Sequence, residues 1–408
     1  MVEKNNRFLL WDWFLILVCC VYTFEQLSYF LPVKEIVFLL VGCVVVLFAK
    51  KGLGLDRSLF WLALYSIVLF VNFFSGDKAF SNFGRVIQEV AILFFTAKLF
   101  CYIVTKDLSK MSYYLIVSTL AIIIYYSIFT YLIDMQNPGI VRRTVALANQ
   151  GDEELMTLYS NGLVNYSLPH AVPILIPAII INIKNKSLAI RTRLLLILSL
   201  IAALVIVYLS YSATALLLSL VTLVLSLVVK SGNLKDNIIR LAFVSIIALP
   251  FIINIDLLLN PLVRFFSSSE QATYFDRLLD IQNLANTGTA TGDIEDRKNM
   301  YDITLSSLNG NLLFGVNEKP GGHSAILDRL ASLGLIGWVP FICFIIYQIR
   351  YTVKRIDGYS LSYYVVGVFA GIIMLLTKNM SNWEVWFVLF TLMPLMLWLP
   401  YHNDKSNK

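Results

Sequence analysis

His323 is the residue whose type and surroundings most clearly suggest chemistry in this sequence. It is one of three histidines in 408 residues, and it follows a Gly-Gly pair in the stretch GGHSAILDRLASLGLIG, residues 321–337. Ser324 is a residue type that caps helix N-termini, so the stretch predicts a helix that begins near Ser324. An imidazole at such a terminus can bind an anion or accept a proton. We therefore expect a functional histidine, the alternative being a structural one at a half-buried position.

The helix expected after His323 has one apolar face and two charges. The apolar face would carry Ile326, Leu327, Leu330 and Leu333. Helical spacing places Asp328 and Arg329 away from the centre of that face. The helix would continue past Gly334 and Gly337 into an apolar segment that is long enough to cross a membrane.

Arginines close to His323 in the sequence could neutralise a phosphate. A loop expected at about residues 259–332 contains Arg264, Arg277, Arg297, Lys298, Lys319 and Arg329. A second expected loop, at about residues 134–167, adds Arg142 and Arg143. The guanidinium fork matches phosphate oxygens, and lysine supplies a point charge. Because the larger loop also carries many acids, the alternative is a solvated loop whose arginines pair with carboxylates.

Glu89 and Lys98 both fall within an expected span at about residues 86–104. Ionisable side chains inside a span are costly and usually face a cavity or a partner. Their separation of nine residues places them on opposite sides of a helix, which argues against a direct pair. We expect Glu89 to bind a hydroxyl group of a substrate, or else to stay wet near the interface. Lys98 is expected to extend toward the cytoplasmic interface.

The elements that must position these residues are membrane helices. The chain is 58% hydrophobic and 14% charged, whereas soluble domains have about 25% charged residues. Apolar segments of about 17–25 residues can cross a bilayer as helices. Twelve candidate spans are expected at about 8–24, 35–49, 58–74, 86–104, 112–133, 168–183, 192–209, 212–229, 241–258, 333–349, 361–377 and 385–400. The seventh and eighth are separated only by Ser210–Ser212, and merging them would leave eleven.

The expected fold is all-α: a polytopic membrane protein with about twelve transmembrane helices, residues 1–408 forming a single integral membrane domain. More than half of the 32 Lys and Arg residues lie in segments that this topology places in the cytoplasm together with both termini. The loops at about 134–167 and 259–332 would then lie outside. The larger loop would contain short interfacial helices, because EQATYFDRLLDIQNL and DRKNMYDITLSSL have apolar residues at helical spacing. Trp383 and Trp386 are expected in the interfacial aromatic belt.

The same residues limit the classes of ligand. No cluster of histidines, cysteines or acids has the spacing of a metal site, so neither a metal nor another cofactor is expected. Basic residues occur in short clusters between spans, a distribution that is typical of membrane topology and argues against nucleic acid as a partner.

Two motifs together resemble the superfamily of O-antigen polymerases and O-antigen ligases. One is His323, ten residues and Gly334, leading into Gly-Leu-Ile-Gly at the start of a span. The other is DRKNMYDITLSSLNGNLLFGVN, residues 296–317, with an arginine, an amphipathic helix and a short apolar turn that ends in Gly-Val. The specific match covers Asp296 to Gly337. The expected topology, with one large loop late in the chain, is compatible over the rest.

The resemblance implies a bacterial cytoplasmic membrane protein that acts on undecaprenyl-diphosphate-linked oligosaccharides at the outer face. It implies that His323 corresponds to the family histidine and Arg297 to the loop arginine. Where the family often has an arginine after a serine, this chain has Ala213 after Ser212, and Arg142 and Arg143 are candidates to replace it. The pathway's flippase and chain-length regulator are possible partners.

Several functions remain open on sequence grounds. The capsule, exopolysaccharide and O-antigen polymerases are favoured over the ligases, because ligases commonly have an asparagine after the histidine and this chain has Ser324. From another class, a flippase would move lipid-linked sugars without forming a bond, and Pro169, Pro173 and Pro177 in one expected span are compatible with that function. A catalytically silent scaffold is the third alternative.

Overall fold

The computed structural model describes residues 10–24, 35–48, 57–74, 83–141, 157–158, 161–164, 167–230, 236–237, 240, 260, 264, 272–287, 292–316, 322–378 and 382–406. Over these residues the chain is helical and contains no strand. The helices are α1 (Leu10–Thr23), α3 (Glu35–Phe48), α4 (Arg57–Phe74), α5 (Phe83–Thr105), α6 (Ser109–Gln136), α9 (Leu168–Lys184), α10 (Ile190–Leu209), α11 (Ala213–Val228), α14 (Ala272–Thr287), α15 (Gly292–Ser306), α16 (Ala325–Val353), α17 (Gly358–Thr377), α18 (Trp383–Phe387) and α19 (Met393–Ser406), with a π-helical turn between α18 and α19.

Six of the described helices are long and apolar enough to cross a membrane: α4, α5, α6, α10, α16 and α17. Their length and composition support the expected class of all-α membrane protein. Shorter apolar helices, α1, α3, α9, α11 and the segment from α18 into α19, coincide with other expected spans. The expected span at 241–258 lies outside the described residues.

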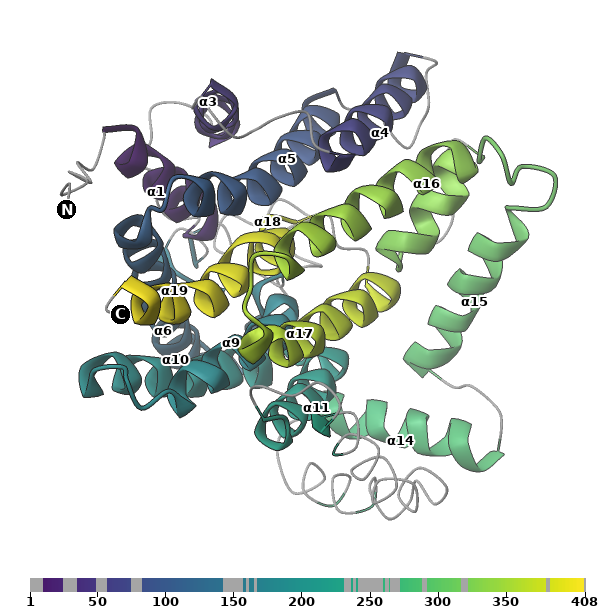
Figure 1. The fold of residues 1–408 in the computed structure, drawn as a ribbon. Coiled ribbons are helices and arrows are strands. Elements are labelled where there is room, and N and C mark those ends of the chain that lie inside the picture. The colour runs from purple at the N-terminus through teal and green to yellow at the C-terminus, as the bar shows by residue number, and fades with distance from the viewer. Residues whose placement is uncertain are drawn as a thin grey trace.

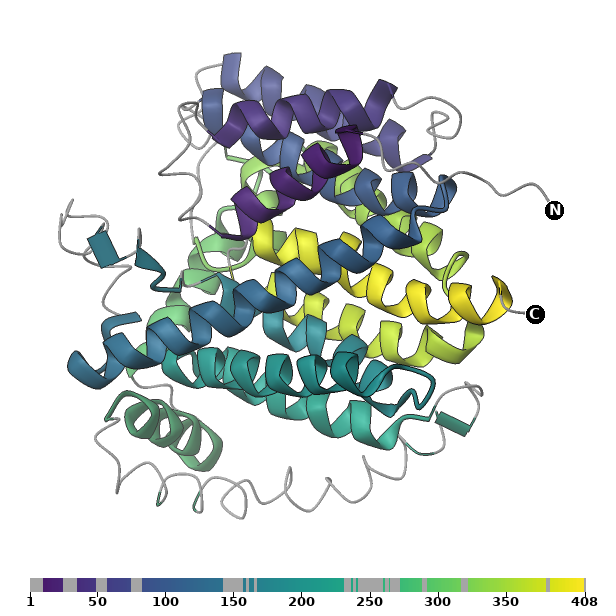
Figure 2. The same cartoon turned by 90° about the vertical axis from the view of Figure 1, so that its left-hand side faces the viewer.

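The helices pack along one another, and α15 lies beyond one end of the bundle (Figure 1). At this end α17 finishes and α16 begins, and we call it the site end. Helix α19 finishes at the opposite end (Figure 1). Figure 2 shows the long α6 slanting across the bundle beside α10. The two stretches with apolar residues at helical spacing, EQATYFDRLLDIQNL and DRKNMYDITLSSL, form most of helices α14 and α15.

Helix α9 is the centre of the bundle. Every residue from Leu168 to Asn182 is buried, because α10, α11, α17 and α19 all pack against it. Close approach to α17 depends on Gly367, where an added Cβ would lie 2.9 Å from the carbonyl oxygen of Ile174. The prolines expected in this span, including Pro173 and Pro177, lie inside one continuous helix.

The break between α10 and α11 confirms that two helices occupy this stretch. Helix α10 ends at Leu209, and Tyr211 adopts a positive φ of 53°. Ser212 then caps α11, and its hydroxyl accepts a hydrogen bond from the backbone N–H of Ala215 at 3.4 Å. The polar SYS tripeptide therefore ends one helix and begins the next, as the sequence predicts.

Helix α16 is divided at Gly334, which has φ 60° and ψ −169°. The backbone N–H groups of Leu335 and Ile336 donate to the carbonyl oxygens of Leu312 and Leu313 at 2.9 and 3.2 Å. They do so in place of the carbonyls of their own helix. A turn from another part of the chain thus fills the break.

Glycines on both sides make this insertion possible. An added Cβ at Gly334 would lie 2.3 Å from the carbonyl oxygen of Leu313, and one at Gly315 would lie 2.2 Å from that of Ser332. Gly315 also has a positive φ of 77°. The turn that ends in Gly-Val and the glycine eleven residues beyond His323 are therefore two halves of one backbone contact.

One expectation about spans is wrong. Trp383 and Trp386 are buried rather than interfacial, since Trp383 packs on Tyr22 and Phe387, and Trp386 stacks on Phe390. Lys98 is fully buried, and its ammonium donates to the hydroxyl of Ser58, the second residue of α4, at 2.7 Å.

Candidate functional site

The two elements that carry His323 and Arg297 meet at the end of α17. The backbone N–H of Ala325, at the start of α16, donates to the carbonyl oxygen of Lys378 at 2.9 Å. From α15, the Tyr301 hydroxyl donates to the carbonyl oxygen of Leu376 at 3.3 Å. The start of α16 and the middle of α15 are therefore held by neighbouring residues of α17.

The backbone that follows His323 is fixed by a reciprocal helix cap. The Ser324 hydroxyl accepts from the N–H of Leu327 at 3.1 Å, which confirms the expected cap. The Asp328 carboxylate in turn accepts from the N–H of Ser324 at 3.0 Å. This arrangement satisfies N–H groups that a helix start otherwise leaves without partners. His323 itself is half-buried, at the point where the chain enters the cap.

Arg297 reaches from α15 to the first turn of α11. Its guanidinium Nη1 lies 3.5 Å from the Thr214 hydroxyl, and the side chain is half-buried. Thr214 is the second residue of α11, directly after Ala213. A cation at the positive end of a helix dipole is electrostatically unfavourable unless an anion is bound between them. The position therefore suits a site for an anion.

His170 lies in the first turn of α9, next to the same helix start. Its imidazole Nε2 is 3.2 Å from the Ser212 hydroxyl, and the side chain is buried. The positive charges of Lys378 and Arg297 are both close enough to act electrostatically on this ring. A histidine from α9 and an arginine from α15 thus lie where α11 begins, and the positive charge of Lys378, at the end of α17, also acts on the histidine.

Sequence analysis did not identify His170 as a site residue. An available signal was its type, because a histidine near the end of an expected span is an ionisable group that needs a partner. Its neighbours could not be inferred from the sequence, since Ser212 is 42 residues away and Arg297 lies in the distant helix α15.

The tyrosine of α15 stays protonated at neutral pH. Burial raises the pKa of Tyr301 above its ordinary value, and the nearby Asp328 carboxylate raises it further, while Arg297 acts in the opposite direction. A protonated hydroxyl keeps its hydrogen bond to α17, and so α15 stays attached at neutral and mildly alkaline pH.

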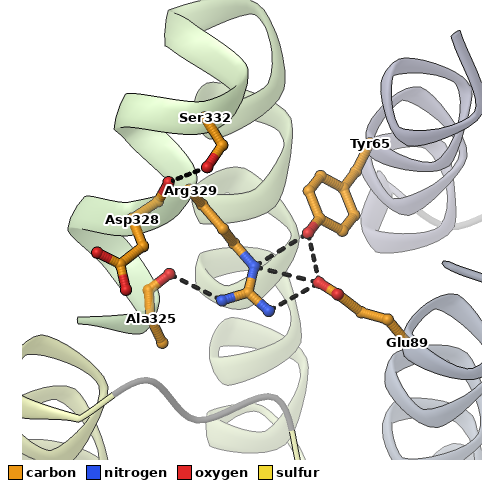
Figure 3. A network of polar contacts seen from close by, with 6 residues as sticks. All are labelled: Tyr65, Glu89, Ala325, Asp328, Arg329 and Ser332. Carbon is orange, nitrogen blue, oxygen red and sulfur yellow. Dashed lines mark hydrogen bonds and ion pairs between the residues drawn. The ribbon is translucent and has the colours of Figure 1, made fainter. Parts of the chain in front are cut away.

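Glu89 and Arg329, both predicted to bind substrate, contact each other (Figure 3). The Arg329 Nη2 lies 2.7 Å from Glu89 Oε1, and Nε donates to the Tyr65 hydroxyl at 3.0 Å. Tyr65 in turn donates to Glu89 Oε1 at 2.6 Å. Nη1 donates to the carbonyl oxygen of Ala325 at 2.8 Å, and the guanidinium lies 4.6 Å from the centre of the Phe341 ring. This network joins α4, α5 and both parts of α16.

The burial of Arg329 corrects the expected orientation of the start of α16. Asp328 and Arg329 are buried, whereas Ile326 and Leu327 remain partly exposed. The helix turns its charged side inward because Ser324 and Glu89 supply partners there. Hydrogen-bonded partners make such burial tolerable, and removing one of them leaves an uncompensated charge in a low-dielectric interior.

The remaining predicted arginines are Arg264, Arg277, Arg142 and Arg143. Arg264 is exposed, at an isolated described position. Arg142, Arg143 and the side chain of Arg277 lie outside the described residues.

The groups at the start of α11 and the start of α16 can bind an anion and can transfer a proton. Arg297 and Lys378 provide positive charge for an anionic group, and His323 provides a titratable nitrogen at the end of α17. Comparison with family models finds no match, and comparisons with curated proteins and with solved structures find no significant match either.

Proposed function

We propose that this chain is a membrane glycosyltransferase that polymerises undecaprenyl-diphosphate-linked oligosaccharide repeat units. It would act at the outer face of a bacterial cytoplasmic membrane, in the synthesis of a capsule, exopolysaccharide or O-antigen. The observation that supports the proposal is that α15, which carries Arg297, and the start of α16, which follows His323, both hydrogen-bond to the end of α17. Arg297 and His323 are the two residues that the resemblance assigns to chemistry, and they come from different elements.

The residues support a metal-independent substitution at an anomeric carbon. The acceptor hydroxyl oxygen forms a bond to that carbon, and the bond from the carbon to the diphosphate oxygen breaks. The leaving diphosphate takes the electron pair, and Arg297 and Lys378 stabilise its charge. The proton of the acceptor hydroxyl passes to the imidazole of His323. In the other role that fits His323, the ring donates a hydrogen bond to the diphosphate.

The test is a product assay with purified protein and a lipid-diphosphate oligosaccharide in detergent. The polymerase hypothesis predicts products longer by whole repeat units, and His323→Ala is expected to abolish them while the protein still inserts. A base and a donor differ in pH dependence: a base must be neutral, so activity rises with pH through its pKa, whereas a charged donor gives the opposite slope. Wild-type product levels in His323→Ala would remove this residue from the mechanism.

A ligase or a transporter gives a different result in the same assay. A ligase elongates no donor and transfers glycan only when a lipid or cell-wall acceptor is added. The broken α16 is the observation that favours a transporter, since discontinuous helices occur at transport sites. A transporter would form no glycosidic bond, but would move the lipid-linked sugar across the bilayer of sealed proteoliposomes.

A further inference from the structure

Arg329 contacts several helices, whereas a residue that only binds substrate would not need to. Its guanidinium bonds to Glu89 of α5 and Tyr65 of α4. It also bonds to the carbonyl oxygen of Ala325 and lies against Phe341. The last two residues belong to the two parts of α16, on either side of Gly334. One side chain therefore contacts both parts of α16. Figure 3 shows its bonds to Ala325, Tyr65 and Glu89.

The first part of α16 is attached on two sides by other bonds. Backbone hydrogen bonds link it to the end of α17, through Ala325 and Lys378, and to the inserted turn, through Ala331 and Val316, but they do not link residues 325–333 to α4 or α5. The orientation of this short part determines where Ser324 and His323 lie, because the helix cap is formed within it. A side chain that ties this part to α4 and α5 therefore sets the position of the imidazole.

We propose that Arg329, held by Glu89 and Tyr65, is a positioning residue for His323. The ion pair fixes the first part of α16 against α4 and α5, and thereby fixes the backbone that leads from His323 into the helix cap beside the end of α17. The catalytic part of this statement rests on the proposed function, but the structural part does not. The proposal replaces the expectation that Glu89 and Arg329 bind substrate.

The position of the imidazole segment can be measured without any activity assay. The full-length protein, with its native cysteines replaced, would carry His323→Cys and be labelled with a maleimide in detergent. Adding Arg329→Met is expected to raise the labelling rate at position 323 by at least about tenfold, because the attachment of this segment is lost. A second cysteine site at the exposed Asn309 reports general loosening, and its rate is expected not to change. An unchanged rate at position 323 overturns the proposal.

Isosteric and matched variants guard against simple misfolding. Glu89→Gln keeps the shape of the side chain and removes only its charge, and it is expected to give the same direction of change as Arg329→Met. Lys98→Met is the matched control, since Lys98 is also a buried cation and bonds to α4, but near the opposite end of α5. It is expected to lower thermal stability without altering labelling at position 323.

Kinetics distinguish positioning from substrate contact. With His323 restored, Glu89→Gln is expected to lower kcat by about tenfold or more and to leave KM nearly unchanged, because the substrate loses no contact. Arg329→Lys keeps the charge but cannot make all the bonds of the guanidinium fork. It is expected to have a kcat between those of Arg329→Met and the wild type. A raised KM with unchanged kcat would assign both residues to substrate binding and overturn the proposal. If the wild-type protein forms no polymer, the proposed function fails, and the labelling result still decides the structural claim.

Discussion

At Arg297 the surroundings favour a guanidinium over an ammonium. The side chain approaches Thr214 in the first turn of α11 while His170 and Lys378 lie close by. A planar fork can donate to a hydroxyl and to two phosphate oxygens together, whereas a lysine at the same position offers a single point charge on a flexible stem.

Arg297→Lys is therefore expected to weaken donor binding although the charge is retained. We expect KM for the lipid-diphosphate donor to rise about tenfold, which corresponds to about 1.4 kcal/mol of lost binding. Initial rates over a range of donor concentrations measure the change. Lys298→Ala is the control, since Lys298 is the next residue of α15 but is exposed. Equal KM values for Arg297→Lys and the wild type would show that Arg297 is a solvated helix residue.

Residue roles differ in how far the sequence could predict them. The cap at Ser324 follows from local residue types and is confirmed. The pairing of Glu89 with Arg329 spans 240 residues and left no local signal beyond an acid in an expected span and an arginine in an expected loop. Trp383 was assigned to the interface because tryptophan is common there, but packing on Phe95 and Phe387 outweighs that preference.

At the scale of elements, the broken α16 depends on glycine at two positions. The contact between the inserted turn and the break leaves no room for a side chain at Gly315 or Gly334. Both residues also have positive φ, where a Cβ costs further energy.

Gly334→Ala is expected to destabilise the protein by roughly 2–4 kcal/mol, since the new Cβ forces the inserted turn to move. Unfolding in a detergent titration measures the loss. Gly310→Ala separates the two causes, because Gly310 has a positive φ of 81° but open space around its Cβ position. It is expected to lose only about 1 kcal/mol. Similar losses in the two variants would mean that backbone conformation, and not the contact with the turn, explains the requirement for glycine.

Most elements were predictable because membrane helices have a strong hydrophobic signal. The separation of α10 from α11 was also predictable from three polar residues. The inserted turn was recognisable as a motif, yet its role in completing another helix was not, because that role consists of backbone hydrogen bonds between distant segments.

For the whole molecule, the proposed function requires the site end to face outward. Basic residues support this orientation, since the opposite end of α16 carries Arg350, Lys354 and Arg355. Those residues lie close to the cytoplasm in the expected topology, while α15 and the start of α16 lie outside.

Labelling from either side of the membrane tests this orientation. In a chain with its native cysteines replaced, a cysteine at the exposed Asn309 is expected to react with a membrane-impermeant maleimide in intact cells or spheroplasts. A cysteine at the exposed Lys354 is expected to react only after the membrane is permeabilised. The reverse pattern would place His323 and Arg297 in the cytosol, away from a donor that is displayed outside, and would contradict the proposed function.

The enclosure of α9 affects how the chain matures during synthesis. Asn182 of α9 is bonded to the carbonyl oxygen of Met396, which the ribosome adds 214 residues later. Until α17 and α19 arrive, the side of α9 that packs against them, including Asn182, lacks its final neighbours. The last helices therefore complete the interior. A chain that ends before α17 lacks the helix whose end holds α15 and the start of α16.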